Sequence, residues 1–90
     1  MTLDAEHVKS ELAAVADADD AVNLSRFFKT GPGEYGEGDV FIGVRVPKTR
    51  RVVRAHRGLQ RSEVVVLMES PVHEHRLAGL LVLVEQYAAA

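Results

Sequence analysis

The sequence lacks cysteine and tryptophan and holds only three prolines among its 90 residues. Without cysteine there is no disulfide framework, no thiolate metal site and no cysteine nucleophile. The longest uncharged apolar run, from Leu77 to Val84, is far shorter than the roughly 20 residues that a membrane-spanning helix needs. Acidic residues at positions 4 and 6 precede any apolar stretch, which is untypical of a signal peptide. We therefore expect a cytoplasmic protein with no membrane partner.

Charge is distributed unevenly along the chain. The net charge is only −2, and the apolar content of 47% indicates a folded chain rather than a disordered one. Residues 1–39 hold nine acidic and three basic residues, whereas residues 40–62 hold seven basic residues and no acidic one. A length of 90 residues allows one small domain, so we expect a single helical domain over residues 1–90. Its most distinctive surface is the basic segment.

Apolar spacing and capping residues predict five helices. The second follows the acidic stretch 17–20 and ends at about residue 29, and the others lie at about residues 5–16, 47–57, 63–69 and 71–87. Asp4, Ser62 and Ser70 are the predicted N-caps of the first, fourth and fifth helices, and the acidic stretch at 17–20 supplies the cap of the second. Pro47 and Pro71 suit the first turn of a helix. The tight turn between the last two helices predicts an antiparallel hairpin of the kind stacked in α-solenoids.

Five of the seven glycines fall between positions 31 and 43, in a long loop. We interpret this segment as a structural loop whose glycines permit positive φ and close packing. Residues 40–42 are expected to enter the core briefly or to form a short extended stretch. The alternative is a divalent cation held by Glu34, Glu37 and Asp39, although their spacing is not that of an EF-hand.

No metal or cofactor is expected. His73 and His75 are two residues apart on a predicted helix, hence about 200° apart around its axis, and cannot bind one metal ion together. His7 and His56 have no histidine near them in the sequence.

The predicted last helix is apolar on nearly its whole circumference, which is typical of a helix buried on all sides. Four short helices are too few to cover it. We therefore expect self-association, or contact with a further helical layer, through six residues: Leu77, Leu80, Leu81, Val82, Leu83 and Val84.

The segment from Arg26 to Pro47 reads RFFKTGPGEYGEGDVFIGVRVP. It resembles the N-terminal signature of the AlkD-like DNA alkylation repair family. Residues 70–77 and 85–87 are similar to the first helical repeat of that family. The resemblance covers about residues 24–87. It implies HEAT-like antiparallel repeats that begin an α-solenoid, with a basic concave groove for duplex DNA.

The resemblance also implies a link to enzymes that hydrolyse the N-glycosidic bond of alkylated purines. In the family, tryptophans contact the sugar of the lesion and an aspartate stabilises the developing oxocarbenium ion, both in a part that the resemblance does not reach. Here tryptophan is absent and every aspartate lies at or before Asp39. No catalytic residue is therefore carried over, and we expect these 90 residues to be inactive alone.

The predicted third helix carries the candidate site. Arg50, Arg54 and Arg57 share one face, while Thr49, Val52, Val53 and His56 lie opposite. This arrangement predicts that one face packs on the domain and the other meets the phosphates of duplex DNA. The alternative is a solvated face whose cations pair with the acidic N-terminal segment; the resemblance favours DNA. The candidate DNA-backbone residues are Arg45, Lys48, Arg50, Arg51, Arg54 and Arg57.

Three functions remain open at this point. The first is a DNA-binding helical module of the alkylpurine glycosylase type without its catalytic part. The second is a HEAT-like protein–protein interaction module that uses the apolar last helix. The third is a partial protein that assembles with a separate chain.

Overall fold

The computed structural model describes residues 3–89, and within them the chain forms helices joined by irregular segments. Between residues 3 and 89 the only extended pairing is an isolated parallel bridge between Val40 and Val72. The expected all-α fold is confirmed. The five helices are α1 (Ala5–Ala14), α2 (Ala18–Phe27), α3 (Val46–Ala55), α4 (Arg61–Met68) and α5 (His73–Ala89).

The starts of the first three helices follow the sequence signals. The Asp4 carboxylate accepts a hydrogen bond from the backbone N–H of His7 at 2.8 Å and caps α1. Asp17 accepts from the N–H of Asp20 at 2.9 Å and caps α2. Pro47 lies in the first turn of α3, where its missing N–H leaves no hydrogen bond unmade. These three predictions are confirmed.

Helix α4 begins before the predicted cap, so the prediction of Ser62 as N-cap is wrong. The N-cap is Gln60, whose carbonyl accepts the N–H groups of Glu63 and Val64 at 3.0 and 3.1 Å. The side chain of Glu63 is used elsewhere, because its Oε1 accepts the N–H of Ala5 at 2.9 Å. This bond joins the first turn of α4 to the start of α1.

Helix α5 begins at His73 rather than at Pro71, because the preceding residue is held in an extended conformation. Val72 forms the bridge with Val40, and the N–H of His73 donates to the carbonyl of Val40 at 2.8 Å. Residues 40–42, predicted to enter the core briefly or to form a short extended stretch, do both. Val40 forms the extended bridge, and Phe41 beside it is buried.

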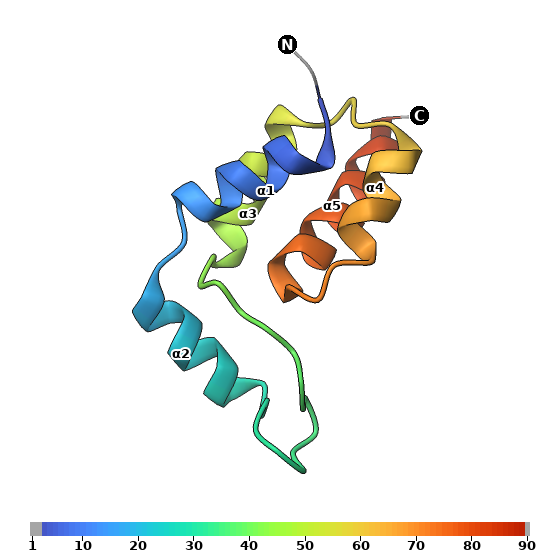
Figure 1. The fold of residues 1–90 in the computed structure, drawn as a ribbon. Coiled ribbons are helices and arrows are strands. Elements are labelled where there is room, and N and C mark those ends of the chain that lie inside the picture. The colour runs from blue at the N-terminus through green and yellow to red at the C-terminus, as the bar shows by residue number, and fades with distance from the viewer. Residues whose placement is uncertain (1–2, 90) are drawn as a thin grey trace.

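Helices α1, α3, α4 and α5 enclose the core, an arrangement consistent with HEAT-like antiparallel repeats (Figure 1). α4 and α5 run side by side in opposite directions, as the predicted hairpin requires. Gly79 allows their close approach, because a Cβ there would lie 3.2 Å from the Cβ of Leu67. The core residues are Ala5, Val8, Leu12, Val44, Val52, Val53, Leu59, Val64, Leu67, Ala78 and Val82.

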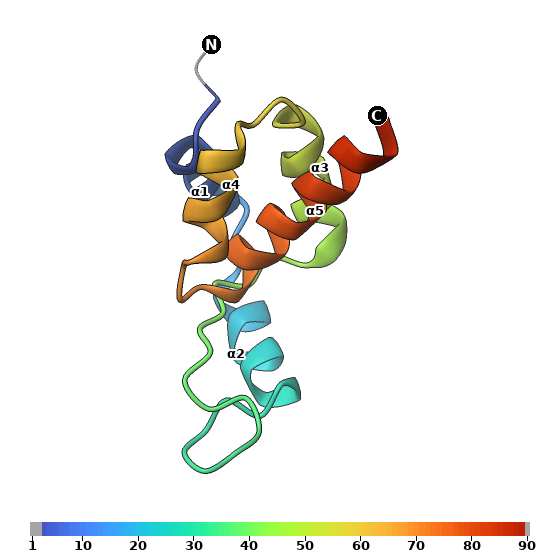
Figure 2. The same ribbon diagram turned by 90° about the vertical axis from the view of Figure 1, so that its right-hand side faces the viewer.

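Helix α2 stands apart from the other four helices in both views (Figures 1 and 2). None of its residues is fully buried, and together with the glycine-rich segment it forms an arm at one end of a molecule that measures 40 × 22 × 21 Å. The arm is therefore held by individual contacts rather than by core packing. Two of those contacts, from Asp17 to Gly43 and from Asp20 to Arg45, lie just before α3.

The apolar α5 is covered more completely than its composition suggests. Val82 is fully buried, and Leu77, Leu81 and Leu83 are half-buried. Only Leu80 and Val84 of the six are exposed, at 49% and 53%. The expectation that four helices are too few to cover α5 thus holds for one stripe of the helix only. No helix within residues 3–89 is long and apolar enough to cross a membrane.

Candidate nucleic-acid interface and the adjoining cleft

Helix α3 has one buried face and one basic face. Thr49, Val52 and Val53 are buried against the domain, and His56 just beyond the helix is buried with them. This confirms the predicted packing face. His56 is not isolated, because its Nε2 contacts the carboxylate of Glu11. The burial fixes the rotation of α3, so the opposite face is directed to solvent.

The six predicted site residues fall into two groups. Arg45 and Arg57 are engaged within the chain: Nη2 of Arg45 lies 2.9 Å from Oδ1 of Asp20, and Nε of Arg57 lies 3.2 Å from Oε2 of Glu85. The pair with Asp20 matches the alternative in which cations meet the acidic N-terminal segment. The remaining four are exposed and form no ion pair within residues 3–89: Lys48, Arg50, Arg51 and Arg54.

The segment leading into α3 is held by a buried carboxylate. Oε1 of Glu74 accepts the N–H of Ile42 at 3.1 Å, and Oε2 accepts the N–H groups of Gly43 and Val44 at 2.9 and 3.1 Å. Glu74 is only 1% exposed and lies near the start of α5. Burying a carboxylate is costly unless hydrogen bonds satisfy it, and three backbone donors do so here. Glu74 thereby holds the backbone of the segment that leads into α3.

Gly43 joins this segment to the start of α2. Its carbonyl accepts the N–H of Asp17 at 2.9 Å. Its φ is +88°, and a Cβ at this position would lie 1.8 Å from the carbonyl oxygen of Asp17. Only glycine fits so close to another backbone in this conformation. Together with the positive φ of Gly33 and Gly38, this confirms the interpretation of a structural loop.

The loop is also fastened to α5 by Asp39. Its carboxylate accepts from Nη2 of Arg76 at 2.6 Å and contacts Nδ1 of His73 at 3.1 Å. Burial alone would raise the pKa of Asp39, but the hydrogen bonds and charges of Arg76 and His73 outweigh it and hold this pKa below its ordinary value. Asp39 is thus a loop anchor rather than a cation ligand. Within residues 3–89 no group of three or more His, Asp and Glu is placed to hold a metal ion.

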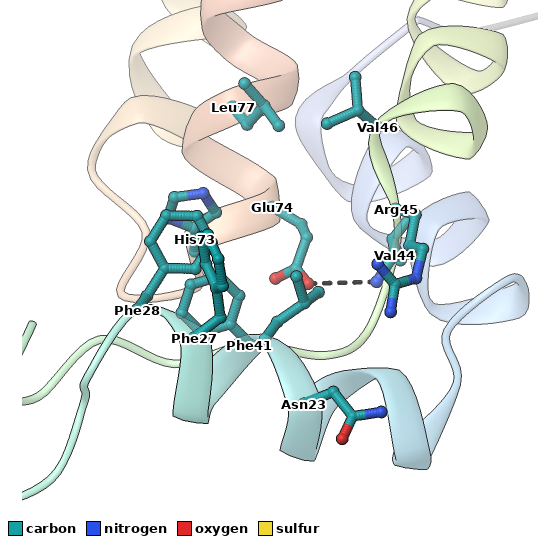
Figure 3. A pocket seen from close by; sticks show the side chains of 11 residues that line it. Asn23, Phe27, Phe28, Phe41, Val44, Arg45, Val46, His73, Glu74 and Leu77 are labelled. Carbon is teal, nitrogen blue, oxygen red and sulfur yellow. Dashed lines mark hydrogen bonds between the residues drawn. The ribbon is translucent and has the colours of Figure 1, made fainter.

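A cleft of about 420 Å³ lies between α2 and the starts of α3 and α5 (Figure 3). Its wall is mostly apolar and includes a cluster of four rings, from Phe27, Phe28, Phe41 and His73. Arg45 lines the cleft on the side of α3. The cleft therefore adjoins the start of α3, the helix that carries the basic face.

Neither this cleft nor the hydrogen bonds of Glu74 are among the features predicted above from the sequence. One signal was available for the cleft, since Phe27 and Phe28 are flanked directly by Arg26 and Lys29. Adjacent aromatic and basic residues are typical of surfaces that bind single-stranded nucleic acid. Glu74 gave no such signal, because its partners are backbone groups some 30 residues earlier in the chain.

Comparison with known protein families places this geometry among known sequences. A family model described as DNA alkylation repair enzyme matches residues 8–90. The match includes the cleft, the glycine-rich loop, α3 and the α4–α5 hairpin. No curated protein and no solved structure matches the chain.

Proposed function

The chain belongs to the DNA alkylation repair enzyme family, and on that premise we propose that it is a DNA-binding helical module of the alkylpurine glycosylase type. In this proposal Lys48, Arg50, Arg51 and Arg54 contact the phosphate backbone of duplex DNA. One observation supports it above the others. These four cations are exposed on the side of α3 opposite its buried face, and no carboxylate within residues 3–89 pairs with them.

The dimensions of α3 suit a DNA backbone. At a rise of 1.5 Å per residue, the four cations extend along about 9 Å of helix. Successive phosphates of one strand advance by about 3.4 Å along the duplex, so this length corresponds to two or three phosphate spacings, which is about three to four phosphates. Each arginine can offer two parallel donors to a phosphate. Such contacts position a protein on DNA without reading its sequence.

We place the catalytic residues of the family outside this module. Hydrolysis of the N-glycosidic bond requires a group that stabilises an oxocarbenium-like transition state. The chain has no tryptophan, and the last aspartate, Asp39, is occupied by Arg76 and His73. The proposed role is therefore to bind DNA, not to cleave the bond.

Binding to duplex DNA should weaken steeply with salt. Each phosphate contact releases counterions and contributes about −0.9 to the slope of log K against log salt concentration, so four contacts give about −3 to −4. Replacing Arg50, Arg51 and Arg54 with Ala should flatten the slope to about −1. Fluorescence anisotropy with a labelled duplex, between about 50 and 200 mM salt, measures both slopes.

The matched control is Arg57→Ala, because Arg57 already pairs with Glu85. This variant should nearly keep the wild-type slope. Alanine is the best helix former, so the triple variant should retain α3, which circular dichroism verifies. An unchanged slope in the triple variant, or no binding at the lowest salt, would contradict the proposal.

We also propose that the outer face of the α4–α5 hairpin pairs with a second copy of the chain. The observation that favours this second function is a group of exposed apolar side chains on two adjacent helices: Val65, Val66 and Met68 on α4, and Leu80, Val84 and Tyr87 on α5. Large exposed apolar side chains gathered on neighbouring helices commonly mark an interaction site. A two-fold pairing closes on itself and leaves no such surface exposed.

Sedimentation equilibrium tests the pairing. The wild type should show a concentration-dependent dimer, and Val84→Glu should be monomeric, since it places a charge in the paired face. Val22→Glu on α2 is the control, because Val22 is exposed to a similar degree and lies outside the hairpin. A monomeric wild type, or equal association of the two variants, would contradict the pairing.

A further inference from the structure

We propose that the cleft beside α2 binds an unpaired DNA base, stacked against Phe27, where a single strand leaves the duplex held on α3. The inference rests on the proposed function, because it extends the same DNA-binding surface. It adds a second mode of recognition, in which aromatic stacking on a base supplements ionic contact with the backbone.

The first argument is the exposure of the rings. Phe28 stacks on Phe41 with centroids 5.2 Å apart, and Phe41 stacks on His73 at 4.5 Å. Phe27 meets Phe28 edge-on, with an interplanar angle of 77°. Phe41 is buried and supports the group, whereas Phe27 remains 77% exposed beside the cleft. A phenylalanine so exposed contributes little to the core and is available to a ligand.

The second argument is charge. Arg26 and Lys29 flank the two exposed phenylalanines, are exposed themselves and form no ion pair within residues 3–89. The carboxylates near the rings are engaged: both oxygens of Glu74 accept backbone N–H groups, and Asp39 binds Arg76 and His73. The carboxylate that lines the cleft, Glu74, is therefore engaged, whereas Glu34 and Glu37 of the loop are exposed but lie outside the lining of the cleft. Aromatic side chains between cations suit a ligand that is planar and anionic, as a nucleotide is.

The third argument is continuity with α3. Arg45 lines the cleft, and its carbonyl accepts the N–H of Lys48 at 3.0 Å in the first turn of α3. A strand held on the exposed cations of α3 thus reaches the cleft by passing the first turn of that helix. The cleft volume of about 420 Å³ lies in the range typical of small-ligand pockets.

Three forms of one duplex test the inference: a blunt end, a short single-stranded overhang, and the same overhang built from abasic sugars. The abasic form keeps the phosphates and removes the bases. The base-bearing overhang should bind at least about five-fold more tightly than the abasic one, because stacking on an aromatic side chain is worth that much per base. Phe27→Ala should abolish this gain and leave binding to the blunt duplex unchanged. Tyr35→Ala, which removes a fully exposed ring outside the cleft, should keep the gain.

Equal affinity for the base-bearing and abasic overhangs, or a gain that survives in Phe27→Ala, would overturn the inference. If blunt duplex binds but the overhang adds nothing, only this inference fails. If blunt duplex does not bind, the proposed function fails, and a single-stranded trinucleotide then tests the cleft directly. When the trinucleotide is added, the largest chemical-shift changes among the protein amides should lie at Phe27, Phe28 and His73. Changes centred on α4 and α5, or none, would overturn the cleft as a base site.

Discussion

Replacing Glu74 with Ala should lower the free energy of unfolding by at least about 3 kcal/mol. The carboxylate accepts the N–H groups of Ile42, Gly43 and Val44, and it is buried. Its removal leaves three backbone donors without a partner in a place that water reaches poorly, and each unsatisfied buried donor costs about 1 to 3 kcal/mol. For a chain of this length the total stability is only about 5 to 13 kcal/mol, so the loss is severe.

Urea denaturation followed by circular dichroism measures this loss. The matched control is Glu69→Ala, because Glu69 is exposed and its side chain forms no hydrogen bond or ion pair within residues 3–89. The control should change stability by less than about 0.5 kcal/mol. Equal midpoints for the two variants would show that the Glu74 hydrogen bonds do not hold the segment before α3.

Gly43→Ala is the second substitution with a large expected effect, a loss of about 2 to 5 kcal/mol from backbone strain and overpacking together. The new Cβ would lie 1.8 Å from the carbonyl oxygen of Asp17 and 2.7 Å from the backbone nitrogen of Ala21. Both atoms belong to backbone, which cannot rotate out of the way as a side chain does. We expect the arm formed by α2 to detach from the rest of the domain.

Gly38→Ala is the control that separates the cost of a positive φ from the cost of the steric clash with the backbone of Asp17. Gly38 has nearly the same φ, +85° against +88°, but a Cβ there would meet nothing within 4 Å. This control should cost only about 1 to 2 kcal/mol, from the left-handed conformation alone. Hydrogen exchange measures the local effect. The N–H of Asp17, which donates to the carbonyl of Gly43, should lose its protection from exchange in Gly43→Ala but not in Gly38→Ala. Equal unfolding free energies for the two variants would contradict the close backbone approach.

Features set by local chemistry could be predicted from the sequence. The five helices follow from apolar spacing, and the caps at Asp4 and Asp17 follow from short side chains that reach the first turn. The buried face of α3 follows from the helical positions of Thr49, Val52 and Val53. The helices, their caps and the buried face of α3 each depend on residues within one or two helical turns of one another. Over that distance, helix geometry determines which side chains are neighbours.

Features that depend on distant partners could not be predicted. Ser70 and Pro71 form a good local start signal, yet α5 begins later because Val72 pairs with Val40. The pairing of Arg45 with Asp20 depends on how α2 lies against the start of α3. The cleft has the same origin, because it arises where the arm approaches the packed helices. Such contacts leave no periodic pattern in the sequence.

Binding of the DNA backbone to the exposed face of α3 can be observed by titrating isotope-labelled protein with a blunt duplex and following amide chemical shifts. We expect the largest changes at Lys48, Arg50, Arg51 and Arg54, and raising the salt concentration should reverse them. Changes centred instead on α4 and α5, or no change at low salt, would contradict this binding.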